Sequence, residues 1–311
     1  MPTMKAARID RFGPIGHIAL REIERPAPGP GEVLVRVHAS GVGPWDAWIR
    51  TGQSTRVPAE SLPVTLGSDL SGVVEAIGPG VVSVAVGDEV FGVTNPWFNG
   101  ANAEFALAQA SMIARKPARL GHVAAASMPV IAVTAWQVLA EYGGLEAGQR
   151  VLVLGAAGNV GAYAVQLARS LGATVVALTR PHESQRVRDL GAAEAIGPED
   201  LEAESALADI VIDTVGEALQ QRALAALRPG AILVSAVSPP DAALAAARHA
   251  RAVFFIVEVT TERLTRIADM AERGELVPNV GIVLPLGEIH RAHEMLDGLR
   301  ERPTGKIVLS G

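Results

Sequence analysis

Residues 151–161 read VLVLGAAGNVG, an apolar run that leads through a glycine-bearing turn into a helical pattern over 160–171. A strand, a tight turn and a helix in this order can present backbone N–H groups and a helix N-terminus to a diphosphate. The usual fingerprint is G-x-G-x-x-G. Here Ala156 stands at the first glycine position, Gly158 and Gly161 fill the other two, and Gly155 comes one step early. Alone, the turn fits a dinucleotide site or a tight turn of another α/β protein.

The sequence around this turn alternates apolar strands with helical patterns. We expect six strands, at 150–155, 174–179, near Ala195, and at 209–213, 231–236 and 253–259, with helices at 160–171, 183–190, 218–227 and 241–249. Near-continuous apolar strands that alternate with helices predict a doubly wound parallel sheet. The turn follows the first strand, where such sheets hold a dinucleotide.

The first 120 residues have a different pattern, with alternating strands at 32–38, 71–77 and 89–93 between Pro- and Gly-rich turns. Short strands of this kind predict a compact barrel or sandwich. A helical pattern covers 123–139. The tail has helical patterns at 261–273 and 286–299 and a short strand at 305–309. We therefore predict an α/β protein with one domain formed by 1–120 and 261–311, and a second formed by 121–260.

Composition excludes several function classes. The 311 residues allow about two domains. A net charge of −6 gives no electrostatic footprint for nucleic acid. The chain has no cysteine, which excludes disulfides, cysteine zinc ligands and a thiol nucleophile. No apolar run is long enough to span a membrane, and the N-terminus lacks a signal-peptide pattern. These features predict a cytoplasmic protein without nucleic-acid or membrane partners.

The end of the second predicted strand reads ALTRPH (177–182) and carries no acid. A carboxylate there favours NAD, whereas a basic residue accommodates the 2′-phosphate of NADP. Arg180 stands at this position, and a guanidinium can pair with two phosphate oxygens. We therefore predict NADPH, the alternative being that Arg180 is an ordinary surface residue. His182 is either a second contact or a bystander, and Glu183 comes one turn too late to be the expected carboxylate.

Two later loops also follow strand ends, at 213–216 (DTVG) and 235–238 (SAVS). Ligands of open α/β sheets lie at the carboxyl ends of the strands, so both loops are either cofactor contacts or plain connections. The predicted cofactor-binding residues in this part of the chain are Ala156, Ala157, Gly158, Asn159, Val160, Gly161, Thr179, Arg180, His182, Asp213, Val215, Ser235, Ala236 and Val237.

Taken together, these motifs resemble the medium-chain dehydrogenase/reductase superfamily, and within it the zinc-independent quinone oxidoreductase branch. The resemblance covers essentially the whole chain and rests on GVGPWDAWIRTG (41–52), LGSDLSGVVE (66–75), VGDEVFG (86–92), Thr134-Ala135, AAGNVG (156–161) and GKIVL (305–309). It implies a GroES-like β-barrel domain packed on a Rossmann domain, with the active site in the cleft between them. It also implies that Thr134 lies near the nicotinamide, that Lys306 belongs with the cofactor-binding residues, and that the segment 253–259 forms the edge strand of a homodimer.

Two departures from the family pattern concern the site. Zinc alcohol dehydrogenases have Gly-His-Glu where this chain has Gly67-Ser68-Asp69, so we expect no metal. His290 and His293 share the i, i+3 spacing of a helix, and we favour a solvated pair over a metal site. Quinone-reducing relatives have Asn and Tyr where this chain has Gly43 and Trp48, and neither replacement can act as a general acid.

The predicted function is an NADPH-dependent, zinc-independent transfer of hydride to a planar conjugated carbonyl such as a quinone or enone. Such a substrate spreads the developing charge over its own π-system, and water can protonate the enolate. The candidate catalytic residues are Trp48, Gly43, Asp46 and Thr134. Asp46 either contacts substrate or braces its loop, and we favour bracing. The alternatives are an enoyl-thioester or other alkene reductase, and a catalytically weak NADPH-binding protein that resembles a crystallin or sensor.

Overall fold

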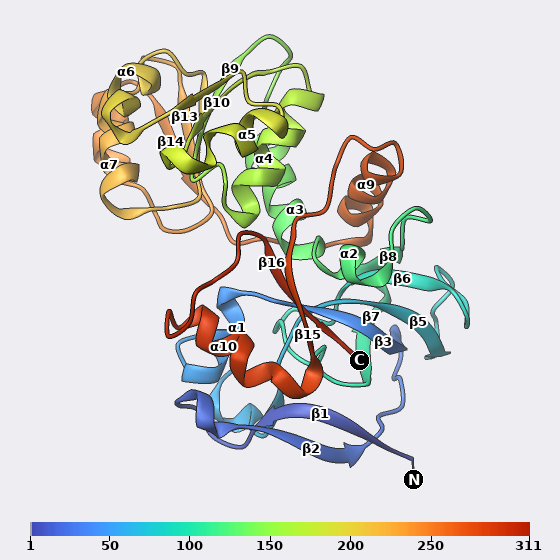
Figure 1. Ribbon diagram of the computed structural model, residues 1–311. Coiled ribbons are helices and arrows are strands. Elements are labelled where there is room, and N and C mark those ends of the chain that lie inside the picture. The colour runs from blue at the N-terminus through green and yellow to red at the C-terminus, as the bar shows by residue number, and fades with distance from the viewer. Residues whose placement is uncertain (1) are drawn as a thin grey trace. The chain divides into compact units, whose positions relative to one another are not determined.

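The computed structural model describes residues 2–311, which divide into two compact units (Figure 1). The two-segment unit consists of the chain up to Val130 together with Val259–Gly311, and the Rossmann unit is Ile131–Glu258. The first division falls later than the predicted boundary at residue 121. The reason is that α2 (His122–Ala126) packs against strands β3 (Glu32–Val42) and β5 (Asp69–Ile77) of the two-segment unit.

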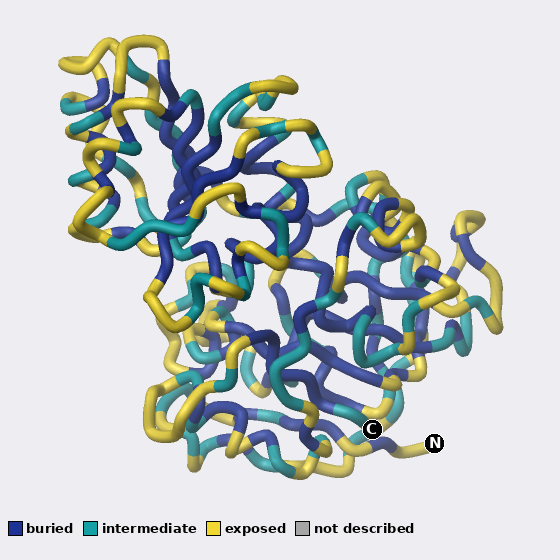
Figure 2. Tube along the Cα trace, turned by 45° about the horizontal axis from the view of Figure 1, so that its top comes forward, coloured by how far each residue is buried: buried dark blue, intermediate teal, exposed yellow. Residues whose placement is uncertain are grey.

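The Rossmann unit contains, in the described part of the chain, a parallel sheet of six strands in the order β11-β10-β9-β12-β13-β14. Counted from its first strand, this is the 3-2-1-4-5-6 order of dinucleotide-binding sheets. The strands are almost completely buried in the middle of the sheet (Figure 2). Their bounds are β9 Arg150–Leu154, β10 Thr174–Leu178, β11 Glu194–Ile196, β12 Ile210–Asp213, β13 Ile232–Ser235 and β14 Arg251–Phe254.

Helices fill the connections, and α4 packs against β9 and β10. The helical pattern at 123–139 is not one helix: α2 ends at Ala126, α3 starts at Pro129, and a π-helix spans Gln137–Tyr142. Proline is favoured at a helix start and cannot donate within a helix, which explains the break. The other helices are α3 Pro129–Trp136, α4 Asn159–Ser170, α5 Ser184–Asp189, α6 Leu201–Ser205, α7 Glu217–Ala226 and α8 Ala242–Ala247. Among residues 2–311, no helix combines the length and the apolar character needed to cross a bilayer.

The last strand of this sheet is shorter than predicted. We expected a strand over 253–259, but β14 ends at Phe254. The chain beyond it turns to the π-helix, because the ring of Phe255 stacks on Tyr142 at 4.5 Å and the Glu258 N–H donates to Gln137 Oε1 at 3.1 Å. β14 still forms one end of the strand order.

The two-segment unit is built around β3. The described residues form a sheet in the order β15-β16-β3-β5-β6-β8, with β7 also on β3, and a second sheet β2-β1-β4. Val308 of β16 lies opposite Gly41 of β3, so the tail returns to this unit. The remaining bounds are β1 Thr3–Ile9, β2 Ile18–Glu24, β4 Val64–Thr65, β6 Glu89–Val93, β7 Phe105–Gln109, β8 Ile113–Arg115, β15 Val280–Pro285, β16 Lys306–Ser310, α1 Pro44–Thr51, α9 Thr261–Glu272 and α10 Ile289–Leu296.

Candidate functional site

The turn after β9 depends on Gly155, not on the fingerprint position held by Ala156. Gly155 has φ +74°, a left-handed conformation that favours glycine. A Cβ at Gly155 would also lie 2.7 Å from Thr214 Oγ1 and 2.7 Å from Val215 Cγ2. In the sequence this glycine stands one step before the first fingerprint position, and the standard spacing does not assign it a conformation.

Gly161 lets α4 approach this turn closely. A Cβ there would lie 2.2 Å from the carbonyl oxygen of Gly155, which is backbone and cannot move aside as a side chain would. Gly158 is the N-cap of α4, and no side chain caps the helix. The two glycines therefore have different roles: Gly161 permits packing, and Gly158 leaves the helix end bare.

The bare helix end carries backbone donors without protein acceptors. Gly158 N–H donates to Gly155 O and Ala162 N–H donates to Gly158 O, both at 2.9 Å. The N–H groups of Asn159, Val160 and Gly161, which lie between them, donate to no group among residues 2–311. Free N–H groups at a helix N-terminus are suited to a diphosphate. The fit of a dinucleotide here therefore rests on donors that the protein leaves unsatisfied.

The end of β10 brings together a cation and an acid. Arg180 and His182 are both exposed, which fits a residue at the ribose edge and an ordinary surface residue alike. Thr179 Oγ1 donates to Glu183 Oε2 at 3.1 Å, because the short turn Pro181–Glu183 folds back on the strand end. From its position in the sequence, Glu183 was expected to come one turn too late to be the carboxylate at the ribose. The structure instead holds its carboxylate at the strand end.

Asp213 and Ser235 brace the two loops that follow β12 and β13. Asp213 Oδ1 accepts the N–H groups of Val215 at 3.0 Å and Gly216 at 2.8 Å, and its Oδ2 accepts the Ser235 hydroxyl at 2.7 Å. Both side chains are fully buried, so they position the loops and have no exposed surface. Val215 and Val237, which these loops carry, are 41% and 47% exposed.

The other predicted residues of the Rossmann unit lie around the turn or in the helical layer. Ala156, Ala157 and Thr134 are buried, and Thr134 lies on α3. Ala236 is half-buried, and its N–H donates to Asp213 O at 3.1 Å. The predicted residues that end or follow the strands β9, β10, β12 and β13 therefore lie at the carboxyl end of the parallel sheet, whereas Thr134, on α3, follows none of these strands.

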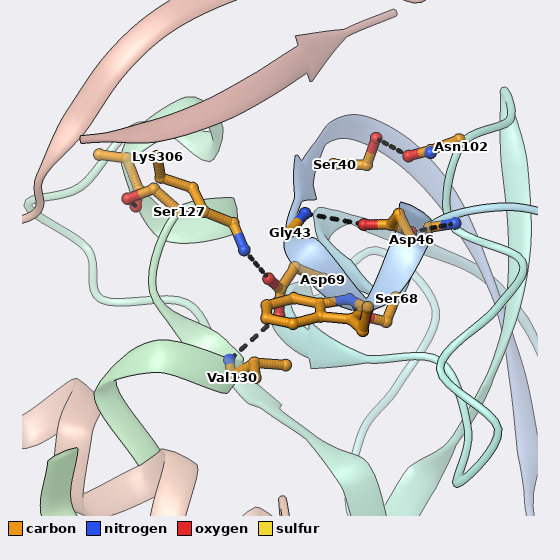
Figure 3. A network of polar contacts seen from close by, with 12 residues as sticks. Ser40, Gly43, Asp46, Ser68, Asp69, Asn102, Ser127, Val130 and Lys306 are labelled. Atoms are coloured by element: carbon orange, nitrogen blue, oxygen red, sulfur yellow. Dashed lines mark hydrogen bonds and ion pairs between the residues drawn. The ribbon is translucent and has the colours of Figure 1, made fainter. Parts of the chain in front are cut away.

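A buried ion pair lies in the two-segment unit (Figure 3). Lys306 Nζ is 2.7 Å from Asp69 Oδ2, and both side chains have no exposed surface. Asp69 Oδ1 accepts the Val130 N–H at 3.0 Å, and Lys306 Nζ lies 4.2 Å from the centre of the Trp45 ring. The resemblance placed Lys306 with the cofactor-binding residues. The structure instead uses its ammonium to neutralise Asp69.

Asp46 braces the loop before α1, which was the favoured alternative. Its Oδ2 accepts the Gly43 N–H at 2.8 Å, and its Oδ1 accepts the Gly67 N–H at 2.9 Å. The side chain is completely buried, so it has no surface for a substrate. Burial raises the pKa of Asp46 to about 7, against the two backbone donors and nearby Lys306, which lower it.

Position 43 has no room for a side chain, because the Trp45 ring occupies the space next to the Gly43 Cα. A Cβ at Gly43 would lie 2.4 Å from the Trp45 ring, whose Nε1 donates to Ser68 Oγ at 2.9 Å. A larger residue at 43 therefore requires a different ring position at 45. Trp48, on α1, is 52% exposed and is free to offer an aromatic face.

Comparisons with known proteins agree with this architecture. Residues 29–118 match the model of the alcohol dehydrogenase GroES-like domain, and residues 190–309 match the model of a zinc-binding dehydrogenase. The quinone oxidoreductase of Sus scrofa is 31% identical over 98% of this chain and 97% of its own length. The chain belongs to the medium-chain dehydrogenase/reductase family. This confirms the predicted fold, a GroES-like domain with a Rossmann sheet.

Two further relatives of this family support a nicotinamide-dependent oxidoreductase. The mitochondrial NAD(P)H oxidoreductase RTN4IP1 of Mus musculus is 31% identical over 90% of this chain and 82% of its own length. The quinone oxidoreductase structure from Coxiella burnetii has a TM-score of 0.89, with 28% identity and complete coverage of both chains.

The residues at the zinc position of metal-dependent family members do not fit zinc. Ser68 accepts the Trp45 N–H, and both oxygens of Asp69 are engaged by Lys306 and Val130. Across the described chain, no three His, Cys, Asp or Glu side chains lie close enough to hold a metal ion. We therefore derive no catalytic step through a metal.

The expected solvated histidine pair on α10 is wrong for one member. His290 is exposed, and its Nε2 lies 2.9 Å from Ile18 O. His293 has no exposed surface, and neither ring nitrogen has a hydrogen-bond partner among the described residues. Burial, reinforced by the charges of Arg50 and His290, lowers the pKa of His293 to about 3. The i, i+3 spacing does not reveal that the helix buries only one of the two rings.

Proposed function

We propose that the protein is an NADPH-dependent reductase that transfers hydride to a conjugated carbonyl, a quinone or an enone. The observation that carries the proposal is the set of N–H groups at Asn159, Val160 and Gly161 that have no acceptor among the described residues, where α4 begins without a side-chain cap. NADPH supplies the hydride when it is bound. The chain contributes the diphosphate donors and the loops that Asp213 and Ser235 brace.

The preference for NADPH depends on two residues with opposite effects. Arg180 is free to pair with the 2′-phosphate, which a guanidinium can do through two hydrogen bonds. Glu183, beside Thr179, repels a phosphate and can accept hydrogen bonds from an unmodified ribose. We propose that Arg180 outweighs Glu183, because the carboxylate already accepts the Thr179 hydroxyl.

Cofactor titrations test this preference. Wild-type protein is titrated with NADPH and with NADH, and quenching of tryptophan fluorescence gives the two dissociation constants. Arg180→Ala abolishes the preference for NADPH, and Glu183→Gln increases it. Arg188→Ala, which removes an exposed arginine of the same unit, is the matched control and leaves both constants unchanged. Equal affinity of wild-type protein for the two cofactors contradicts the role of Arg180.

The acceptor is tested by turnover at 340 nm with NADPH and three substrate classes: quinones, enones and enoyl thioesters. We expect oxidation of NADPH with a quinone or an enone, and slower turnover by Trp48→Ala, because this ring is exposed. Turnover confined to enoyl thioesters supports the alkene reductase alternative. Cofactor binding without turnover on every class supports the catalytically weak binding protein.

We also propose that the protein acts in the cytoplasm as a homodimer paired through the end of the Rossmann sheet. No strand of the described residues pairs with the outer edge of β14, and Ile256, just beyond it, is 62% exposed. Open apolar edges are aggregation hazards unless they are covered. Sedimentation equilibrium of wild-type protein and Val253→Lys measures the mass, with a dimer expected for the wild type and a monomer for the variant. A wild-type monomer contradicts the pairing.

A further inference from the structure

Arg56 is a half-buried arginine without a carboxylate partner. It lies in the segment after α1, its Nη1 donates to Pro96 O at 2.5 Å, and its guanidinium lies 4.8 Å from the centre of the Phe98 ring. No other group among residues 2–311 accepts a hydrogen bond from the guanidinium. Its remaining N–H groups are therefore available to a ligand.

The buried cations of the same unit are neutralised by acids. Arg50 binds both oxygens of Asp297 at 2.7 Å, and Lys306 lies 2.7 Å from Asp69. Partial burial of a cation without an acid is unfavourable, and burial lowers the pKa of Arg56. Arg8, on β1, is also half-buried and donates to a backbone carbonyl, Pro63 O at 2.7 Å, but Arg56 differs in lying over an aromatic ring. This placement leaves Arg56 available for an anion that the chain itself does not supply.

Arg56 stands at the end of an array in which cations alternate with aromatic rings. Lys306 Nζ lies 4.2 Å from the Trp45 ring, Trp45 meets Phe98 edge to face at 6.2 Å, and Arg56 covers Phe98. At the Lys306 end the charge is paired with Asp69. At the Arg56 end of the array the charge is not paired with an acid, so this is the end at which an anion can bind.

The loop that carries Phe98 is fixed in an unfavourable conformation. Phe98 has φ +61°, which is uncommon for a residue with a side chain. Two hydrogen bonds to Asn99 O, from Thr94 Oγ1 at 2.7 Å and Asn95 Nδ2 at 2.8 Å, close the loop around it. Strained backbone that its surroundings hold in place is a feature of ligand sites. Here it keeps the ring under the guanidinium.

We propose that Arg56 binds an anionic group, a carboxylate, sulfonate or phosphate, on a flat conjugated substrate. A guanidinium matches such oxygens through two parallel hydrogen bonds. The exposed ring of Trp97, beside Pro96, offers a face for the flat part of the molecule. The inference rests on the proposed function, because it specifies the class of conjugated carbonyl that the protein reduces.

Equilibrium dialysis without NADPH tests binding with a matched pair of probes, 1,4-naphthoquinone-2-sulfonate and 1,4-naphthoquinone. Wild-type protein is compared with Arg56→Met, Arg56→Lys and Arg115→Met. The last variant removes an exposed arginine on β8 and is the control for net charge. Circular dichroism establishes that each variant folds, and Arg56→Lys keeps the charge while losing the planar donor pair.

We expect the sulfonate to bind wild-type protein at least about tenfold more tightly than the neutral quinone. This ratio falls to about one in Arg56→Met, takes an intermediate value in Arg56→Lys, and stays unchanged in Arg115→Met. Failure of wild-type protein to prefer the sulfonate, or a preference that survives in Arg56→Met, overturns the inference. Turnover at 340 nm is measured separately. A preference that depends on Arg56 but comes with no turnover rejects the proposed function and leaves the anion site in place.

Discussion

The turn at 155–161 and the polar cluster around Asp69 differ in whether their polar groups have partners within the protein. The turn leaves the N–H groups of Asn159 and Val160 unsatisfied. The cluster pairs Asp69 with Lys306 and with the Val130 N–H, so its buried charges are compensated within the protein. Unsatisfied donors identify a place for a ligand, and satisfied ones identify a support. Substitutions at the turn should therefore weaken cofactor binding, whereas substitutions in the cluster should lower the stability of the fold.

Removing one charge of the buried ion pair has the largest expected effect. Lys306→Met leaves Asp69 buried without its partner, which should lower the free energy of unfolding by about 3–5 kcal/mol. Urea unfolding measures the change. Asp69→Asn combined with Lys306→Met should recover most of the loss. Glu202→Gln, which breaks the exposed pair with Arg222, is the control and should lower stability far less, because solvent screens this pair. Equal losses would show that burial of the pair is unimportant.

The buried ring of His293 should make stability fall in acid. Its pKa is lowered from 6.5 to about 3. The unfolded chain therefore binds a proton at this histidine below pH 6.5, whereas the folded chain binds it only near pH 3. Stability attributable to His293 is present above pH 6.5 and is lost towards pH 3, by up to about 1.4 kcal/mol per pH unit. His293→Met removes this contribution. Urea unfolding at pH 7 and pH 4.5 should therefore show a smaller loss for the variant than for wild-type protein. The same loss in both proteins contradicts the assignment.

Two alanine substitutions in the turn sharpen the contrast with the cluster. Gly161→Ala places a Cβ 2.2 Å from Gly155 O, whereas Gly158→Ala meets the same atom at 3.1 Å. Forcing the closer contact should cost about 1–3 kcal/mol and should weaken NADPH binding, because α4 must move away from the turn. Gly158→Ala is the matched, milder change. Fluorescence titration and urea unfolding measure both effects, and equal behaviour of the two variants would contradict the close approach.

The smallest effect concerns the pairing of Gly43 with Trp45. Gly43→Ala alone should destabilise the protein, because the new Cβ meets the Trp45 ring. In the background of Trp45→Val the same substitution should cost less, and a double-mutant cycle should give a coupling of about 1 kcal/mol. Additive effects of the two substitutions would contradict the view that the Trp45 ring is what requires glycine at position 43, where quinone-reducing relatives have asparagine.

The sequence predicted what depends on local pattern. Apolar runs such as Val151–Leu154 gave the strands and their parallel sheet, and the spacing of Gly158 and Gly161 gave the turn. The free donors follow from that turn, because backbone N–H groups need no particular side chain. For the same reason the nicotinamide cofactor could be expected before the structure.

Side-chain partners that are distant in sequence could not be predicted. Asp69 and Lys306 are 237 positions apart, and nothing local marks them as a pair. The carboxylate of Glu183 reaches Thr179 only because the chain turns at Pro181. The strand β15 could not be predicted for a different reason: among the described strands it pairs with β16 alone, and its burial pattern shows no clear alternation.

Amide hydrogen exchange at the helix start tests the central claim most directly. Without cofactor, the N–H groups of Asn159 and Val160 have no acceptor in the described part of the chain and should exchange fast. Saturating NADPH should slow their exchange strongly, because the diphosphate accepts these hydrogens, whereas Gly161→Ala should weaken this protection. If fluorescence shows that NADPH is bound but exchange at both residues is unchanged, the assignment of the turn as the diphosphate site is contradicted.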